Sequence, residues 1–331
     1  MPCRGRCAID RRGFILGAAT ALLCARVGRA QPVGKAYRIG IISAGNNPRT
    51  APFYVAFEQR LHELGWTDGG NLMVDFSVGE TREPLADAAA RFVGRSVDLI
   101  LAVGPEAGVK AASGATKTIP IVIVALNYDP VEKGYVEGLA RPGRNITGVF
   151  FRNPEVGAKQ LELLHEAIPS AARVGVLWTN FSSDQLPPIE AAASRLRLQL
   201  EKVELASPYD IDRTFATLKA RRVDAVLAVG DPVIYRERVR IADAALLRRL
   251  PVVGGLAYSD VGILIGFGPD LNNALRKGAE YVDKILRGAK PADLPIDQPT
   301  KFGLSINLKT AKALGLAIPQ SLLLRADDVI Q

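Results

Sequence analysis

Short apolar runs alternate along the chain with segments whose apolar residues recur at helical spacing. The runs lie at residues 38–42, 72–78, 98–103, 119–124, 174–177, 202–205, 225–229 and 252–254. After the first run, Phe53, Phe57 and Leu61 fall on one face of a helix, and a longer helix is predicted over residues 271–287. Nearly continuous apolar strands separated by helices predict an α/β fold whose parallel sheets are covered on both faces.

Three runs of the first half recur in the same order in the second half. The pairs are VDLILAVG at 97–104 with VDAVLAVG at 223–230, YRIGII at 37–42 with ARVGVL at 172–177, and IPIV at 119–122 with LPVV at 250–253. The first pair is identical at six of its eight positions. The period is too long for a solenoid, so we predict two lobes of related design with a ligand cleft between them.

The repeat also sets the expected domain boundaries. We assign residues 36–148 and 265–297 to the first lobe. The second lobe is expected to comprise residues 149–264 and 298–331. A structure with one continuous sheet through both repeats would contradict this division.

Residues 1–30 have the pattern of a cleavable export signal. Several arginines precede an uncharged run that is too short to span a bilayer, and small residues follow it. Arg11 and Arg12, with Phe14 after them, resemble the twin-arginine type, which predicts a periplasmic protein. An ordinary Sec signal with an accidental arginine pair is the alternative. A leucine precedes Cys24 where a lipid-attachment site usually has a small residue, so lipidation is disfavoured.

Composition changes once residues 1–30 are set aside. That segment holds six arginines and one aspartate, so the formal net charge falls from +8 to +3. No basic stripe or aromatic-interleaved cluster remains, which argues against nucleic-acid binding. All three cysteines also lie in this segment, so the rest of the chain can form no disulfide.

The loops at the carboxyl ends of parallel strands face the ligand crevice in open α/β sheets. Those loops lie at 43–47, 104–107, 127–130, 178–180, 230–232 and 256–259. From them we take as candidate ligand-binding residues Ser43, Ala44, Gly104, Pro105, Glu106, Ala107, Asn127, Asp129, Trp178, Asn180, Asp231 and Tyr258. The alternative is that these residues cap helices and pack loops.

An amino acid or a similar zwitterion would use these loops in a definite way. Asp231 is expected to pair with the ammonium group, because the matching position Pro105 has no charge. Backbone N–H groups near Ala44 and Ala107 are expected to hold the carboxylate, and Glu106 opposes this unless it points away. The apolar walls are expected from Tyr128, Trp178 and Tyr258.

Catalytic signatures are scarce. The only histidines, His62 and His165, fall inside amphipathic helices, and residues 31–331 hold no cysteine. The chain has no phosphate-binding P-loop and no nucleophile elbow, and Leu271 stands where a dinucleotide fingerprint starting at Gly266 needs its third glycine. We therefore predict a protein that is not an enzyme and that has no cofactor and no metal. A hydrolase or transferase that uses only carboxylates stays open.

Four further segments resemble the signatures of the ABC-transporter substrate-binding proteins related to the tryptophan/tyrosine-binding group. They are LARPGRNITG at 139–148, YVDKILRGAKPADLP at 281–295, QPTKF at 298–302 and INLKTAKALGL at 306–316. The similarity covers essentially all of the chain after the export signal. It implies a type I periplasmic-binding-protein fold, in which two Rossmann-like lobes with parallel sheets close on a small ligand.

Two positions depart from this family's pattern. Gly104-Pro105-Glu106 stands where the family usually has Gly-Thr-Pro or Gly-Ser-Pro, and Arg144 stands where a second glycine is common. The first departure falls in a loop expected to touch the ligand. The ligand class is therefore left open between an amino acid and an aromatic compound.

The resemblance implies an exported, monomeric binding protein that delivers a small organic solute to a membrane ABC permease. A two-lobed Rossmann-like enzyme, such as a glycosyltransferase, is one alternative. Export without a cofactor motif argues against it, since activated-sugar donors are cytoplasmic. A ligand-sensing module for a receptor kinase is the other alternative, and its binding physics would be the same.

Overall fold

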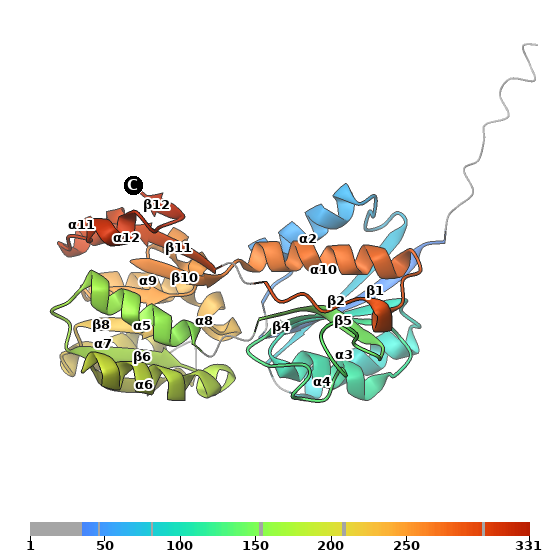
Figure 1. Ribbon diagram of the computed structural model, residues 1–331, viewed down its shortest axis with the longest axis horizontal. Helices are drawn as coiled ribbons and strands as arrows, with labels where there is room; N and C mark the ends of the chain where they lie inside the picture. Colours follow the sequence, from blue (N-terminus) through green and yellow to red (C-terminus); the bar gives the residue numbers. More distant parts are fainter. Residues whose placement is uncertain (1–34, 46, 81, 152–154, 207–209, 300–301) are drawn as a thin grey trace, which may run out of the picture. The chain divides into compact units, whose positions relative to one another are not determined.

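The apolar runs form the strands of two sheets (Figure 1). The computed structural model describes residues 35–45, 47–80, 82–151, 155–206, 210–299 and 302–331. Tyr37–Gln331 forms one unit, to which all the elements below belong. The export signal predicted over residues 1–30 and the loop residue Asn46 lie outside the described residues. Within the described part, no helix has the length and apolarity needed to cross a membrane.

The first sheet has the strand order β2-β1-β3-β4-β5, and all its strands are parallel. Its strands are β1 (Tyr37–Ala44), β2 (Leu72–Gly79), β3 (Leu99–Gly104), β4 (Ile121–Leu126) and β5 (Ile146–Phe151). The helices that cover it are α2 (Pro52–Glu63), α3 (Arg82–Gly94), α4 (Glu106–Ala115) and α10 (Leu271–Leu286). Alternate residues of β3 pack to opposite faces: Leu101 joins the core under α2 and α10, and Ile100 joins the core under α3 and α4.

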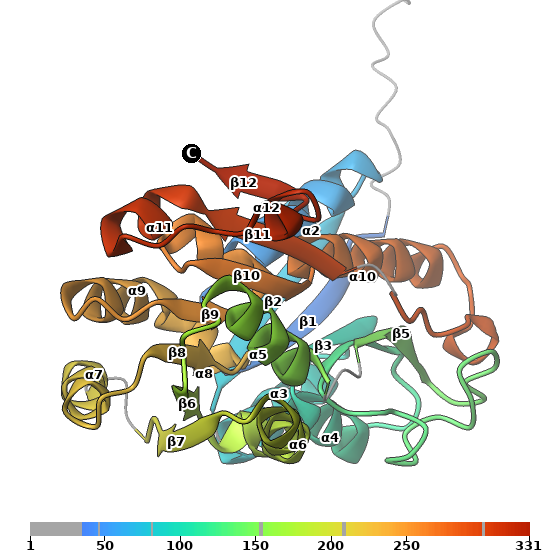
Figure 2. The same cartoon turned by 60° about the vertical axis from the view of Figure 1, so that its left-hand side comes forward.

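The second sheet has seven strands in the order β12-β11-β10-β9-β8-β6-β7. They are β6 (Arg173–Trp178), β7 (Gln199–Glu204), β8 (Ala225–Ala228), β9 (Val252–Gly254), β10 (Ile265–Pro269), β11 (Phe302–Asn307) and β12 (Asp328–Ile330). Its helices are α5 (Val156–Ala167), α6 (Leu186–Leu196), α7 (Ile211–Ala220), α8 (Pro232–Arg236), α9 (Arg238–Leu247), α11 (Leu308–Leu314) and α12 (Gln320–Leu323), with 3₁₀ turns η2 (Asn180–Gln185), η4 (Leu256–Val261) and η5 (Pro291–Asp293) in the connections. Figure 2 shows α5 and α6 side by side on one face, while α7 and α9 pack with the core of the other.

The predicted repeat is visible in the strand order. Strands β7-β6-β8-β9-β10 follow the same order as β2-β1-β3-β4-β5, with each member displaced by one repeat. The expectation of parallel strands throughout is wrong at one place, because β11 pairs antiparallel with β10. The second sheet is therefore mixed, and β12 extends it parallel to β11.

The chain crosses from the second sheet to the first just after the predicted boundary at residue 265. Ile265–Pro269 pairs with β9 and β11 in the second sheet, and α10, immediately after it, packs on the first sheet. Helix α10 lies beside α2 in both views of the ribbon (Figures 1 and 2). The pair is joined by an Arg60–Glu280 ion pair at 2.9 Å and by the Trp66 indole N–H, which donates to Asp283 at 2.8 Å. The division into lobes at the stated residue numbers stays a prediction.

Candidate functional site

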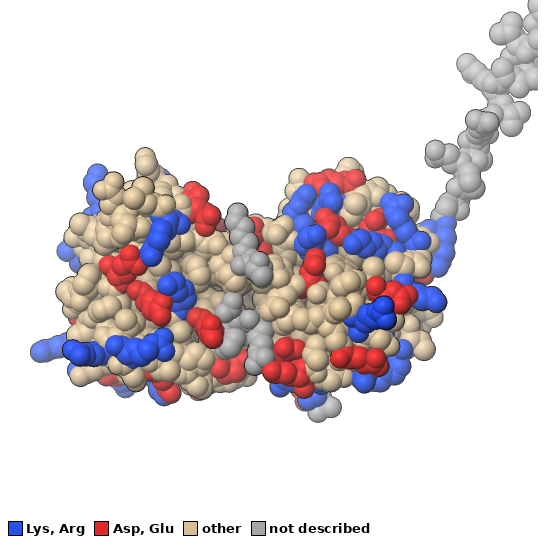
Figure 3. Space-filling model, in the orientation of Figure 1, with Lys and Arg blue, Asp and Glu red and all other residues tan. Residues whose placement is uncertain are grey.

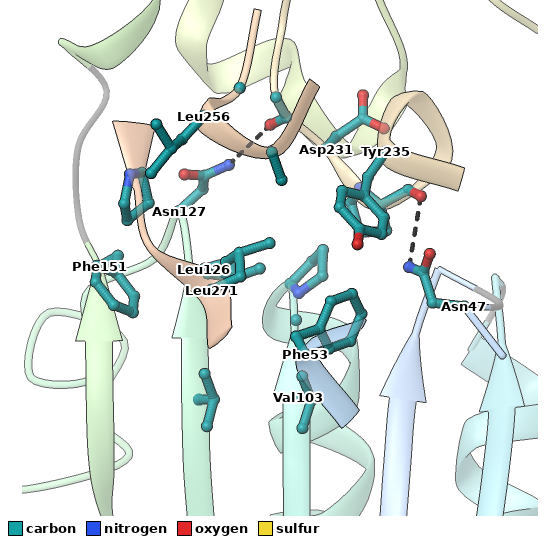
Figure 4. Close-up of a pocket in the computed structure, with 18 of the residues that line it drawn as sticks. Asn47, Phe53, Val103, Leu126, Asn127, Phe151, Asp231, Tyr235, Leu256 and Leu271 are labelled. Atoms are coloured by element: carbon teal, nitrogen blue, oxygen red, sulfur yellow. Dashed lines mark hydrogen bonds between the residues drawn. The ribbon is translucent and has the colours of Figure 1, made fainter. Parts of the chain in front are cut away.

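A pocket lies at the carboxyl ends of the parallel strands, where the topology predicts a ligand crevice (Figure 4). Residues at or after the ends of β1, β3, β4 and β5 line it together with residues after β8 and β9. Helices α2, α5, α8 and α10 contribute further side chains. Both repeats therefore supply the lining of one pocket.

The walls of the pocket are largely apolar. They are formed by Phe53, Val103, Val124, Leu126, Phe151, Val156, Leu256, Phe267, Leu271 and Leu275. The Phe53 ring from α2 packs against the Tyr235 ring from α8, with 5.3 Å between their centroids. Such walls favour a ligand with an apolar body, held in orientation by a small number of polar groups.

Four amide side chains supply much of the polar lining, and all four donate to backbone carbonyls. The bonds run from Asn47 to Pro232 at 3.4 Å, from Asn127 to Gly230 at 3.5 Å, from Gln185 to Gly230 at 3.1 Å, and from Gln160 to Gly254 at 2.9 Å and to Phe267 at 2.7 Å. Figure 4 shows the bonds made by Asn47 and Asn127. A carbonyl oxygen can only accept, so the NH₂ end of each amide must face it.

This orientation leaves the amide oxygens to other partners. The Asn47 Oδ1 and Gln160 Oε1 atoms are buried and have no hydrogen-bond partner among the described residues. Buried polar atoms are almost always paired, because an unpaired one costs about 1–3 kcal/mol. Two unpaired amide oxygens lining one pocket are therefore acceptors that a bound molecule can use.

Asp231 is the N-cap of the short helix α8, in addition to lining the pocket. Its Oδ1 atom accepts from the backbone N–H groups of Val233 and Ile234, each at 2.8 Å. Its Oδ2 atom accepts from the hydroxyls of Thr179 at 2.9 Å and Ser182 at 2.8 Å. Burial raises the pKa of the Asp231 carboxyl above its usual value, and these four hydrogen bonds oppose the shift.

The tyrosines of the pocket are protonated hydrogen-bonding groups. Burial raises the pKa of Tyr54, with the neighbouring Ser43 acting in the opposite direction. Burial, reinforced by the negative charge of Asp231, holds the pKa of Tyr258 well above its ordinary range. Each phenol can therefore donate or accept a hydrogen bond at neutral pH.

Seven of the twelve residues proposed from the sequence line this pocket. They are Ser43, Ala44, Gly104, Pro105, Asn127, Asp231 and Tyr258. Asn127 has a left-handed backbone with φ of 64°, a conformation that asparagine adopts more readily than most residues. Its placement directs the side-chain amide toward Gly230.

The other five proposed residues have partners elsewhere. The Glu106 carboxylate accepts from the Tyr135 hydroxyl at 2.9 Å and pairs with Lys133 at 3.2 Å. Asp129 accepts from two backbone N–H groups of the turn that follows it. Ala107 packs against the core under α3 and α4, and Trp178 packs against the core under α5 and α6. Asn180 lies at the exposed start of η2. Tyr128, expected as a wall, is buried with its ring 6.2 Å from that of Tyr135.

Several lining residues escaped the sequence argument because helices supply them. Tyr54 lies in the first turn of α2 and Gln160 in the second turn of α5, whereas the prediction considered only loops after strands. Gln160 did carry a signal. In the sequence it shares a helix face with glycine, alanine and leucine residues, a face that such spacing predicts to be buried. The structure buries it to 1% exposure, and a buried polar residue needs a partner.

Charge in the pocket is restricted to one residue. Of the described residues that line it, Asp231 alone carries a formal charge, and none is Lys, Arg or His. No group of three or more His, Cys, Asp or Glu within the described ranges could hold a metal ion. The arrangement can accept hydrogen bonds, enclose an apolar body and favour positive charge.

The ABC transporter substrate binding protein family matches residues 39–330. A tyrosine-binding protein of Clostridioides difficile is 26% identical over 288 residues, which cover 85% of this chain and 82% of that protein. An ABC domain from Streptococcus pneumonia, solved in complex with L-Trp, is 26% identical with a TM-score of 0.77. A conserved domain protein from Vibrio cholerae is 25% identical with a TM-score of 0.78. Each of the two structures covers 89% of this chain over its own full length.

These matches confirm the resemblance inferred from the four segments between residues 139 and 316. More distant solved structures, such as a glucose-galactose binding protein from Geobacillus stearothermophilus at 13% identity and a TM-score of 0.56, share the fold alone. The fold is the type I periplasmic-binding-protein fold, with one parallel and one mixed sheet. Since the family match spans nearly all of the described residues, the chain belongs to the ABC transporter substrate-binding protein family.

Proposed function

We propose that this protein is the exported substrate-binding component of an ABC importer and that it captures a small organic solute, an amino acid or an aromatic compound. The observation that carries the proposal is the pocket at the carboxyl ends of strands from both repeats, with two buried amide oxygens unpaired. A ligand in this position would pair those groups and bury its apolar body against Phe53, Phe151 and Leu271. The tyrosine- and L-Trp-binding relatives support an aromatic ligand body.

Binding without turnover is part of the proposal. The described lining offers neither histidine nor cysteine, and its single carboxylate, Asp231, already caps α8. Four hydrogen bonds hold that carboxylate in place, which suits a fixed charge better than a proton carrier. We therefore assign the pocket to recognition rather than to catalysis, with no cofactor.

Thermal unfolding against amino acids, aromatic acids, amines and sugars tests the proposal. A ligand at a hundred times its Kd stabilises the folded protein by about 2.7 kcal/mol. For a folded unit of this size, such stabilisation raises Tm by about 4 °C. A ligand that gives this shift and is recovered unchanged by NMR supports a binding protein. Consumption of the ligand by pure protein, or no shift across the whole set, would contradict it.

Export and delivery complete the proposal. Residues 1–30 act as the signal, by the twin-arginine route, and the partner is a membrane ABC permease rather than a nucleic acid. On the face shown in Figure 3, basic and acidic side chains are intermixed, which fits a monomeric carrier of small molecules. N-terminal sequencing of the protein from the periplasm should find a start near residue 31. Retention of the whole segment there, or export that survives Arg11→Lys with Arg12→Lys, would count against this route.

A further inference from the structure

Two amide side chains of the pocket keep a buried oxygen that can accept a hydrogen bond. Each of the four amides uses an N–H donor on a backbone carbonyl, and Gln160 uses both of its donors in this way. The two oxygens, Asn47 Oδ1 and Gln160 Oε1, are buried without a partner among the described residues. Because both NH₂ hydrogens of Gln160 are engaged by carbonyls of Gly254 and Phe267, this amide cannot rotate to offer a donor.

Two helices, α4 and α8, begin beside the pocket, and each carries an acidic residue at its start. At α8, the N–H groups of Val233 and Ile234 donate to Asp231. At α4, Pro105 has no N–H to offer, and the first helical residue is Glu106. Glu106 does not cap α4, since its carboxylate pairs with Tyr135 and Lys133, but an acidic charge at the start of each helix weakens its attraction for an incoming anion.

Charge acts in the same direction. A ligand carboxylate would be buried with the Asp231 carboxylate, and no basic side chain stands among the described lining residues to offset the repulsion. The hydroxyls of Ser43, Tyr54 and Tyr258 do not change this balance, since a neutral hydroxyl serves a donor as well as an acceptor. A positively charged head, in contrast, would be attracted by Asp231.

We propose that the pocket selects an amine with an apolar or aromatic body and without a carboxylate, its ammonium group held by the amide oxygens of Asn47 and Gln160 and attracted by the negative charge of Asp231. The inference rests on the proposed binding function and narrows it from amino acids to decarboxylated or otherwise anion-free amines. Three N–H donors of an ammonium group match acceptor oxygens, and the apolar walls match the body. The positive charge of the ligand also offsets the buried negative charge of Asp231.

Calorimetry on matched ligand pairs tests this directly. Tyramine and L-tyrosine differ only in the carboxylate, as do tryptamine and L-tryptophan, and phenylacetate offers the anion without the amine. We expect each amine to bind at least about tenfold more tightly than its amino acid, and the acid not to bind. An amino acid that binds as tightly as its amine would overturn this inference and leave the proposed function standing. No binding by any compound of the wider screen would overturn both.

A variant pair separates recognition by the amide from general stability. Gln160→Leu removes a lining acceptor and should weaken amine binding at least about tenfold, as expected for loss of a hydrogen bond to a charged group. Asn145→Leu is the matched control, because the Asn145 amide also donates to a backbone carbonyl, that of Ile119 at 2.7 Å, but does not line the pocket. Equal affinity in the two variants, measured where both are folded by circular dichroism, would contradict the inference. Should Gln160→Leu fail to fold, Asn47→Leu replaces it with the same expected loss.

Discussion

Asp231→Ala should destabilise the protein even without ligand, because the carboxylate is the cap of α8. Loss of an N-cap typically costs about 1 kcal/mol. The Thr179 hydroxyl also loses the acceptor that it reaches at 2.9 Å, which adds about 1–3 kcal/mol, while Ser182 can still donate to the Thr179 carbonyl. The sum of about 2–4 kcal/mol corresponds to a fall in Tm of about 3–6 °C for a unit of this size, measured by calorimetry.

Asp231→Asn is the matched control. Its side-chain oxygen can still accept from Val233 and Ile234, so we expect a loss below about 1 kcal/mol. A Tm for Asp231→Ala equal to that of the wild type, together with abolished ligand binding, would refute the capping argument. It would show that the carboxylate serves the ligand alone.

The same pair gives a pH dependence with a definite sign. Burial raises the pKa of Asp231 above 3.8, so the folded state binds this proton more tightly than the unfolded state does. As pH rises from about 3.8 through the higher folded-state pKa, the wild type should therefore lose stability relative to Asp231→Asn. Denaturation profiles of the two proteins that run parallel across this window would contradict the assigned burial effect.

Three glycine and arginine changes extend the test. Gly148→Ala should lower the free energy of unfolding, measured in urea, by more than about 2 kcal/mol. The φ of Gly148 is +141°, and an added Cβ would lie 2.1 Å from a carbonyl oxygen of β4. An unchanged urea midpoint of unfolding would refute this. Gly45→Ala should weaken ligand binding in calorimetry far more than Gly65→Ala, since both have positive φ but only at Gly45 would the Cβ collide with Pro232, at 1.9 Å; equal affinities would speak against it. Arg236→Ala removes a hydrogen bond to the Gly45 carbonyl at 3.2 Å. We expect ligand affinity to fall by up to about fivefold while Tm stays unchanged. A lower Tm with unchanged affinity would reverse this assignment.

Local pattern was sufficient for most of the fold. The runs at 97–104 and 223–230 each place an apolar strand in the middle of a sheet, and their similarity carried over into the same strand order. Strand β11 was not foreseen, because FGLSIN has no neighbour in sequence with which to pair. Its direction depends on β10, from which it is separated by α10, so the antiparallel pairing is decided by tertiary contacts.

The candidate site was predictable only as far as it follows the strand ends. Ser43, Gly104 and Asp231 lie in the pocket because parallel strands bring their carboxyl ends to one edge. Gln160 and Tyr54 reach it from helices, and their part depends on which helix face is buried and against what. The double role of Asp231 was likewise hidden, since a sequence does not reveal whether a carboxylate faces its own helix or a ligand.

Because α10 packs on the first sheet, the chain must be synthesised as far as Leu286 before the core on that face of the sheet is complete. From the end of β5 at Phe151 to the end of α10 at Leu286 the chain grows by 135 residues. At roughly 5–20 residues per second, synthesis of this stretch takes about 7–27 s, during which one apolar face of the first sheet has no helix α10 to cover it. A ribosome-bound fragment ending after β5 should therefore expose apolar surface that α10 covers in the complete protein. We expect the first repeat alone to fold less stably than the whole chain, because all strands of its sheet are present but the α10 part of its core is missing.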